Sequence, residues 1–168
     1  MLAVIYMVQY VINDGGNDLY IYRLGAETIT DGPGGLGLYE VSLDNYPFTY
    51  PPFAALLFIP FALMPKEVGM ALMMLITAGI AWWLGWVITR YVSRRGVRIP
   101  LYEHLGTAGC ASTLALLIWA SGPWRLTTHF GQINAVILLL VLADFLRPAT
   151  RVPRGVLIGI AGGIKLTP

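Results

Sequence analysis

The chain has 168 residues, of which 57% are hydrophobic and only 12% are charged. Such proportions are typical of polytopic membrane proteins, and the spans leave no room for a soluble domain of normal size. The net charge of +2 carries little information, because in a membrane protein the position of each charge matters more than the sum. The single cysteine, Cys110, excludes an internal disulfide.

The chain begins with a short apolar run, and a long polar loop follows it. Residues 1–12 are apolar but fewer than the ~20 residues that a crossing needs, so we expect the end of a first transmembrane helix. The loop over 13–50 carries six acidic residues and a single basic one, Arg23. A long acidic loop between membrane segments is a natural place for chemistry on a polar substrate.

A short helix is predicted inside this loop. Residues 13–17 are turn formers, after which apolar residues recur at helical spacing over 18–30. Asp18 stands where a helix N-cap would lie, so capping is one interpretation of this side chain and catalysis is the other. Farther on, the three prolines within 46–52 predict a stiff, extended segment.

The remaining apolar segments predict a bundle of transmembrane helices. Residues 53–64 lie between prolines and are too short to cross, so we expect an interfacial helix. Full spans are predicted over 68–91, 105–122 and 130–147. Residues 155–168 begin a last helix that stops partway, as the first one does. We therefore expect an all-α chain that forms the N-terminal part of one polytopic domain in a longer protein, with a genuine short reading frame as the alternative.

Two short basic loops predict the orientation of these helices. They span 90–98 and 147–154 and contain seven of the eleven Lys and Arg residues. Cytoplasmic loops carry such an excess, so both are predicted to lie inside. Counting one span back from each loop places the acidic loop 13–50 and the polar loop 123–132 together on the outer face. Topology thus explains the basic loops, and nothing in the sequence indicates nucleic-acid binding.

Lys165 is the least expected residue of the chain. It lies ten positions beyond Gly155 in an apolar segment, which predicts a depth of about 15 Å if the segment is helical. A charge at mid-membrane costs about 3 kcal/mol, so we expect Lys165 to face a cavity and an anionic partner. The alternative is a helix that ends soon after Pro168, with the lysine extending outward.

Four polar residues gather near the predicted outer end of the span 130–147. Gln132 and Asn134 need hydrogen-bond partners in lipid, and either neighbouring helices or a substrate can supply them. Arg125 and His129 lie just outside this end. Both side chains are candidates for binding phosphate, Arg125 through two parallel N–H groups.

A metal site is conceivable but not favoured. Asp14 and Asp18 could ligate a divalent cation, yet the calcium-loop pattern and its closing glutamate are absent. The two histidines, His104 and His129, do not have the spacing of a zinc site. We therefore predict no metal and no other cofactor.

Four stretches of the sequence form a recognisable series. They are G-G-N-D-L-Y-I-Y-R-L-G-A (15–26), F-T-Y-P-P-F-A-A-L-L-F-I-P-F-A-L-M-P (48–65), H-F-G-Q-I-N-A-V-I-L-L-L-V-L-A-D-F-L-R (129–147) and G-V-L-I-G-I-A-G-G-I-K-L-T-P (155–168). In this order they resemble glycosyltransferase family 87. The resemblance implies a GT-C fold in the plasma membrane. It also implies transfer of a hexose, mannose above all, from a polyprenyl phosphate to a glycolipid or polysaccharide outside the cytoplasm.

The resemblance also implies roles for individual residues. Asp18 matches the family's acidic residue in the first outer loop, the proposed general base of an inverting transfer. The departing lipid phosphate needs positive charge and hydrogen-bond donors, for which Lys165, Gln132, Asn134, Arg125 and His129 are the candidates. Tyr50, with the two prolines after it, would shape the groove for the acceptor or the lipid.

Three alternatives remain open at this stage. An arabinofuranosyltransferase is the alternative within the same family. A transporter or flippase would use Lys165 and Asn134 to line a pathway, but it leaves the acidic loop unexplained. An inactive fragment of a glycosyltransferase would insert into the membrane and make no product.

Overall fold

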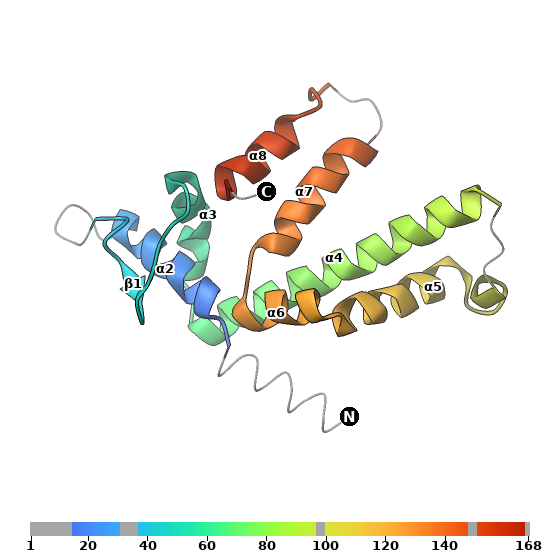
Figure 1. Cartoon of the computed structure of the whole chain (residues 1–168), viewed down its shortest axis with the longest axis horizontal. Helices are drawn as coiled ribbons and strands as arrows, with labels where there is room; N and C mark the ends of the chain where they lie inside the picture. The colour runs from blue at the N-terminus through green and yellow to red at the C-terminus, as the bar shows by residue number, and fades with distance from the viewer. Residues whose placement is uncertain (1–14, 31–36, 97–99, 148–150, 167–168) are drawn as a thin grey trace.

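A computed structural model describes residues 15–30, 37–96, 100–147 and 151–166 (Figure 1). These residues form seven helices and one two-stranded sheet, so the chain is mostly helical and departs from the all-α prediction only at the small sheet. The bounds are α2 Asn17–Thr30, β1 Ser42–Leu43, β2 Tyr46–Pro47, α3 Pro52–Ala62, α4 Lys66–Arg94, α5 Pro100–Ala120, α6 Gly122–Phe130, α7 Asn134–Leu146 and α8 Val156–Ile164. The helix expected over 1–12 lies outside the described residues.

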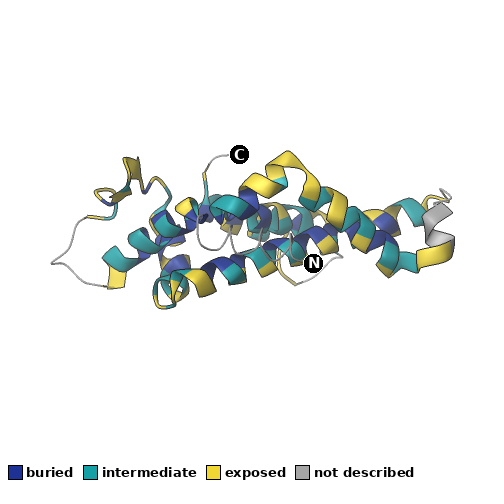
Figure 2. Cartoon of the chain, turned by 90° about the horizontal axis from the view of Figure 1, so that it is seen from below, coloured by how far each residue is buried: buried dark blue, intermediate teal, exposed yellow. Residues whose placement is uncertain are grey.

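The helices form three pairs that meet near the start of α4 (Figure 1). Helix α2 packs along α3, α4 along α5, and α7 along α8. The pairs α4–α5 and α7–α8 extend from the meeting point as two diverging arms (Figure 1). Buried residues lie where helices face each other, and exposed residues lie along the outer sides of the arms (Figure 2). Many of the exposed residues are large and apolar, as a lipid environment would require.

Helix α4 matches the span predicted over 68–91. Its 29 residues measure about 44 Å, more than the ~30 Å of a bilayer's hydrocarbon core. Among the described residues, α4 is the one helix that is long and apolar enough to cross a membrane without a break. Gly85 lets α5 approach closely, since a Cβ there would lie 2.4 Å from the carbonyl oxygen of Ala111.

The next predicted span, over 105–122, is followed in the structure by a sharp bend. The helical residues His104–Ala120 and Gly122–Phe130 are inclined by 75°, so α6 is a separate helix. Ser121 is extended and Pro123 lies at the start of α6. Because proline lacks an N–H and its ring clashes with the preceding turn inside a helix, it is tolerated in the first turn of a new helix more readily than in the interior of an old one.

The span predicted over 130–147 is shorter in the structure. Gly131 has a φ of 65° and ends α6 in the left-handed conformation, so α7 begins only at Asn134. The 13 residues of α7 measure about 20 Å, less than the ~30 Å of a full crossing. The apolar run alone did not reveal this break, because Phe130 and Ile133 continue its hydrophobic character.

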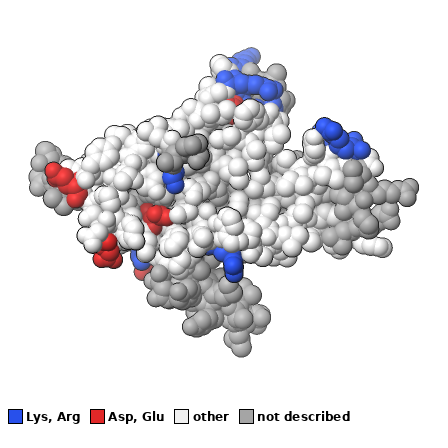
Figure 3. Space-filling model, in the orientation of Figure 1, with Lys and Arg blue, Asp and Glu red and all other residues white. Residues whose placement is uncertain are grey.

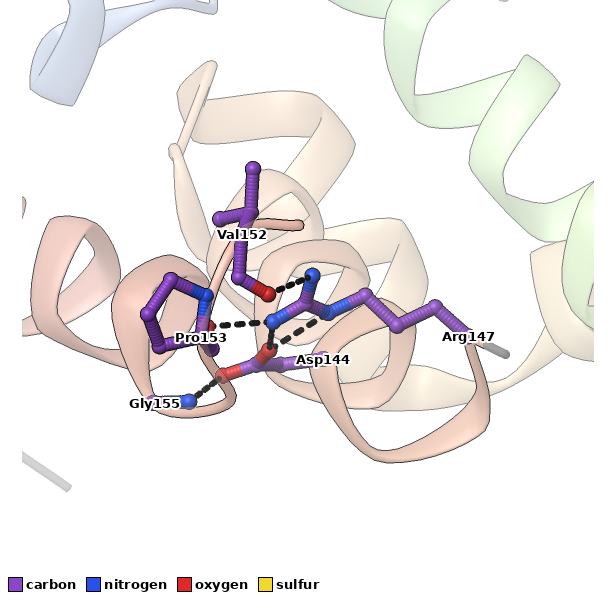
Figure 4. Close-up of polar contacts among 5 residues, drawn as sticks. All are labelled: Asp144, Arg147, Val152, Pro153 and Gly155. Atoms are coloured by element: carbon purple, nitrogen blue, oxygen red, sulfur yellow. Dashed lines mark hydrogen bonds and ion pairs between the residues drawn. The ribbon is translucent and has the colours of Figure 1, made fainter. Parts of the chain in front are cut away.

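A buried carboxylate closes the turn between α7 and α8 (Figure 4). Asp144, only 1% exposed, forms an ion pair with Arg147 at 2.7 Å and accepts the backbone N–H of Gly155. Arg147 also donates to the carbonyl oxygens of Val152 and Pro153. These bonds satisfy polar groups at the end of the hairpin and fix where α8 begins.

The loop before α3 contains a small hairpin. Strands β1 and β2 pair antiparallel through a two-residue turn, in which Asp44 and Asn45 have φ values of 47° and 70°. Asparagine and aspartate tolerate this left-handed conformation, which such turns require. The hairpin leads to Phe48, whose ring packs so closely on Gly25 of α2 that a Cβ there would lie 2.5 Å away.

Two glycines allow the start of α2 to approach the turn between α6 and α7. Gly16 and Gly131 have φ values of 86° and 65°, and the N–H of Gly16 donates to the carbonyl of His129 at 2.8 Å. A Cβ at either glycine would lie 2.8 Å from the sulfur of Met70. A Cβ at Gly131 would also lie 2.9 Å from the Cβ atom of Leu19. A larger side chain at either position would therefore adopt a strained backbone conformation and displace the side chain of Met70.

We expect Gly131→Ala to destabilise the fold by about 1–2 kcal/mol, because a left-handed alanine is strained and its methyl group meets Met70 and Leu19. Thermal unfolding of the purified protein in detergent, followed by circular dichroism, measures the change. Gly122→Ala is the matched control, since a Cβ at Gly122 has no neighbour within 4 Å. Equal melting temperatures for the two variants would contradict the close approach.

Candidate active site between α2 and the start of α7

Asp18 is the second residue of α2 and is half-buried. It lies inside the first helical turn, so the N-cap interpretation of its side chain is wrong. Its Oδ2 atom instead accepts a hydrogen bond of 2.6 Å from Nε2 of Gln132, which follows α6 in the chain.

The polar contacts continue from Gln132 to Lys165. Oε1 of Gln132 accepts a hydrogen bond of 2.7 Å from Nδ2 of Asn134, the first residue of α7. Oδ1 of Asn134 in turn accepts one of 3.0 Å from Nζ of Lys165. Four of the residues predicted for the site therefore form one continuous series of hydrogen bonds, which we call the polar chain: Asp18, Gln132, Asn134 and Lys165.

Tyr50 adjoins the polar chain through its ring. Nζ of Lys165 lies 5.4 Å from the centre of the Tyr50 ring, within the range of a cation–π contact. The hydroxyl of Tyr22 donates to that of Tyr50 at 3.2 Å, and the Tyr22 ring stacks on Phe58 with centres 4.3 Å apart. The structure thus places Tyr50 beside the polar chain, and its role in shaping a groove stays a prediction.

Burial raises the pKa of the Tyr22 hydroxyl well above its usual value, and the nearby Tyr50 and Asp18 raise it further. Burial also raises the pKa of Tyr50. Both phenols are therefore protonated at neutral pH, and the Tyr22 hydroxyl donates its proton to the hydrogen bond with Tyr50. Tyr22 was not predicted as a site residue, because the helix over 18–30 was predicted from the spacing of its apolar residues alone. Its spacing of four from Asp18, which places both side chains on one helix face, could have revealed it.

The structure corrects the expected surroundings of Lys165. Helix α8 ends at Ile164, and Lys165 is extended at its C-terminal end instead of lying inside a helix. It is half-buried, and no carboxylate of the described residues forms an ion pair with it. Asn134 and the Tyr50 ring hold the ammonium without neutralising it. This arrangement leaves its positive charge available to an anion.

The structure places Arg125 and His129 on α6, outside the polar chain. Arg125 is exposed, and its position on α6 keeps it available to a phosphate at the surface. His129 lies in the last turn of α6, where its backbone carbonyl accepts the N–H of Gly16. The proposed phosphate contacts of these two side chains stay predictions.

The metal alternative depends on Asp14, which lies outside the described residues. Among the residues that the structure describes, no three His, Cys, Asp or Glu side chains gather closely enough to hold a metal ion. The polar chain itself contains one carboxylate, two amides and one ammonium. Such a set can accept a proton, donate hydrogen bonds and attract a phosphate.

The largest groups of Lys and Arg side chains lie at the far ends of the two arms (Figure 3). The acidic side chains in view lie mainly around α2 and the hairpin, and single basic side chains lie among them. Two grooves of about 400 and 480 Å³ border the basic end of α4, both lined by Trp86, Arg90 and Arg94. These grooves lie away from the polar chain, which is at the opposite end of α7 from Arg147.

Comparison with known proteins identifies the family. The sequence profile of glycosyltransferase family 87 matches residues 48–168, a range that includes Gln132, Asn134 and Lys165. No solved structure matches the chain significantly.

Curated relatives agree with this match. A polyprenol-phosphate-mannose-dependent alpha-(1-2)-phosphatidylinositol pentamannoside mannosyltransferase of Mycolicibacterium smegmatis is 36% identical over 95% of this chain, and its Mycobacterium tuberculosis counterpart is 35% identical over the same share. A polyprenol-phosphate-mannose-dependent alpha-(1-2)-phosphatidylinositol mannoside mannosyltransferase of Mycolicibacterium smegmatis is 33% identical over 90% of the chain. The chain spans 36–37% of the length of these relatives. On this sequence evidence the chain belongs to glycosyltransferase family 87.

Proposed function

We propose that the protein containing this chain transfers mannose from a polyprenyl-phosphate donor to an extracytoplasmic glycolipid or polysaccharide acceptor, with inversion at the anomeric carbon. The names of the relatives support this donor, and they favour a phosphatidylinositol mannoside as the acceptor. The observation that carries the proposal is the polar chain. It brings a carboxylate from α2 and an ammonium from the end of α8 into one site, although they are distant in sequence.

In the proposed reaction an acceptor hydroxyl oxygen attacks the anomeric carbon of the sugar. The bond from that carbon to the phosphate oxygen breaks, and the polyprenyl phosphate leaves as an anion. Asp18 takes the proton of the attacking hydroxyl as general base. Lys165 stabilises the negative charge that develops on the departing phosphate, because its ammonium is held in place without an ion-pair partner among the described residues.

Gln132, Asn134, Arg125 and His129 have supporting roles in this proposal. Gln132 and Asn134 hold the base and the cation in a fixed relation, and they can bind substrate through polar atoms that the polar chain does not use. Arg125 and His129 lie on α6, where they can contact the phosphate of the donor. Tyr50, which adjoins Lys165, forms part of the wall of the acceptor or lipid groove.

The arrangement of the helices supports a site on the outer face of the plasma membrane. Helix α4 begins beside α2 at Lys66 and ends at Arg94, while α7 begins in the site at Asn134 and ends beside Arg147. Both helices thus run from the site toward arginines. Because arginines gather on the cytoplasmic side of membrane proteins, the polar chain is proposed to face outward.

We expect Asp18→Asn to lower the transfer rate at least ~100-fold, because the amide cannot accept the hydroxyl proton. The assay follows radiolabelled mannose from polyprenyl-phosphate mannose into glycolipid, in membranes containing the full-length protein. Glu27→Gln, which changes another carboxylate of α2, is the matched control and should transfer normally. Substantial transfer by Asp18→Asn would remove Asp18 from the base role.

The same assay separates the remaining alternatives. A transporter would move the lipid-linked sugar across the membrane and form no covalent product. A preference for a polyprenyl-phosphate arabinose donor would replace mannosyl by arabinofuranosyl transfer. An absence of product with either donor would favour an inactive protein.

We expect Lys165→Met to lower kcat and to raise the KM for the lipid-phosphate donor, because the phosphate loses its nearest fixed positive charge. Lys165→Arg should retain part of the activity, since guanidinium also attracts phosphate. Lys66→Met is the control, because Lys66 lies over the Tyr20 ring at 5.7 Å and is not a member of the polar chain. An unchanged donor KM in Lys165→Met would contradict the proposed contact.

A further inference from the structure

We infer that Gln132 and Asn134 are positioning residues that couple Lys165 to Asp18 through hydrogen bonds of fixed direction. We call this coupling the relay, and it needs no contact between the lysine and the aspartate. Its geometry is a property of the structure, whereas its importance for catalysis rests on the proposed function.

Lys165 determines which group donates and which accepts in each hydrogen bond of the polar chain. An ammonium group has donors and no acceptor, so the atom of Asn134 that faces it must be the oxygen Oδ1. The amide of Asn134 is planar, and its Nδ2 group then points to Gln132 and donates to Oε1. With its oxygen engaged, Gln132 presents Nε2 to Asp18. Each amide orientation follows from the one before it.

Thr127 reinforces the same orientation of Gln132. Its buried hydroxyl lies 3.5 Å from Oε1 of Gln132, at the outer limit of a hydrogen bond. The backbone N–H of Gln132 donates to the carbonyl oxygen of Thr127 at 2.9 Å, which fixes the main chain at this point. A reversed Gln132 amide would turn its oxygen toward the carboxylate of Asp18 and lose the contact of 2.6 Å.

The coupling has a consequence for the base. Gln132 engages Oδ2 of Asp18, and no hydrogen bond from the described residues reaches Oδ1. The relay therefore selects Oδ1 as the oxygen that receives the proton of the acceptor hydroxyl. The donor phosphate would bind the same Lys165 ammonium that orients Asn134. Donor binding and the orientation of the base are therefore thermodynamically linked.

Isotope-edited infrared spectroscopy of the full-length protein tests the relay without requiring activity. The carboxylate stretching band of Asp18 is assigned by its disappearance in Asp18→Asn, with Glu27→Gln as the control for other carboxylates. Gln132→Leu should shift this band, because the hydrogen bond to Oδ2 is lost. Lys165→Met should shift it in the same direction, although Lys165 bonds to Asn134 and not to Asp18.

A double-mutant cycle distinguishes the relay from a direct electrostatic effect. In the Asn134→Leu background, Lys165→Met should produce no further shift of the Asp18 band. A shift of equal size in both backgrounds would show that the lysine acts through space, and would overturn the relay. An unshifted band in Gln132→Leu would overturn it as well.

Asn134→Asp provides a directional test. The carboxylate preserves the shape of the side chain and still accepts from Lys165, but it cannot donate to Gln132. Gln132 should then reverse, and the Asp18 band should shift as it does in Gln132→Leu. The relay also requires kcat to fall in this variant more than the donor KM changes. A wild-type protein without transfer activity but with these band shifts would contradict the proposed function alone.

Discussion

The close approach of two glycine backbones determines where the predicted base can lie. Gly16 precedes α2 and Gly131 precedes Gln132, so their contact over Met70 brings Asp18 and Gln132 within hydrogen-bond distance. Both glycines have positive φ values, which a residue with a Cβ adopts at a cost of about 1–3 kcal/mol. The two positions combine a backbone requirement with a steric one. The rest of the site depends on the resulting geometry.

The polar chain also provides hydrogen-bond partners for polar side chains that are half-buried. Its members are half-buried beside an apolar cluster that includes Leu19, Met70 and Ile133, where unpaired polar groups would be costly. Each amide is satisfied by one donor and one acceptor along the chain, so an ammonium and a carboxylate can lie in the same site without direct contact. A direct ion pair would neutralise both groups and reduce their capacity to act on a substrate.

The sequence predicted the helices of this fold better than their ends. The helix over 18–30 and the long α4 follow from apolar periodicity and length, which depend on local sequence alone. The breaks at Gly131 and after Ile164 depend on how segments pack, so continuous apolar runs concealed them. Motif resemblance named Asp18, Gln132, Asn134 and Lys165 as site residues, but their order of contact required coordinates. Tyr22 was missed because its hydroxyl acquires a role only when Tyr50, distant in sequence, is brought beside it.

The hairpin of α7 and α8 fixes the distance between its turn and the candidate site. Asn134 and Asp144 are ten positions apart, and so are Gly155 and Lys165, and each end of α7 is bonded to the corresponding end of the α8 segment. The turn around Asp144 therefore sets the height at which the lysine reaches the site, about 15 Å away. A single residue inserted between Gly155 and Lys165 would rotate the ammonium by about 100° and advance it by about 1.5 Å. The composition of this segment can vary more freely than its length.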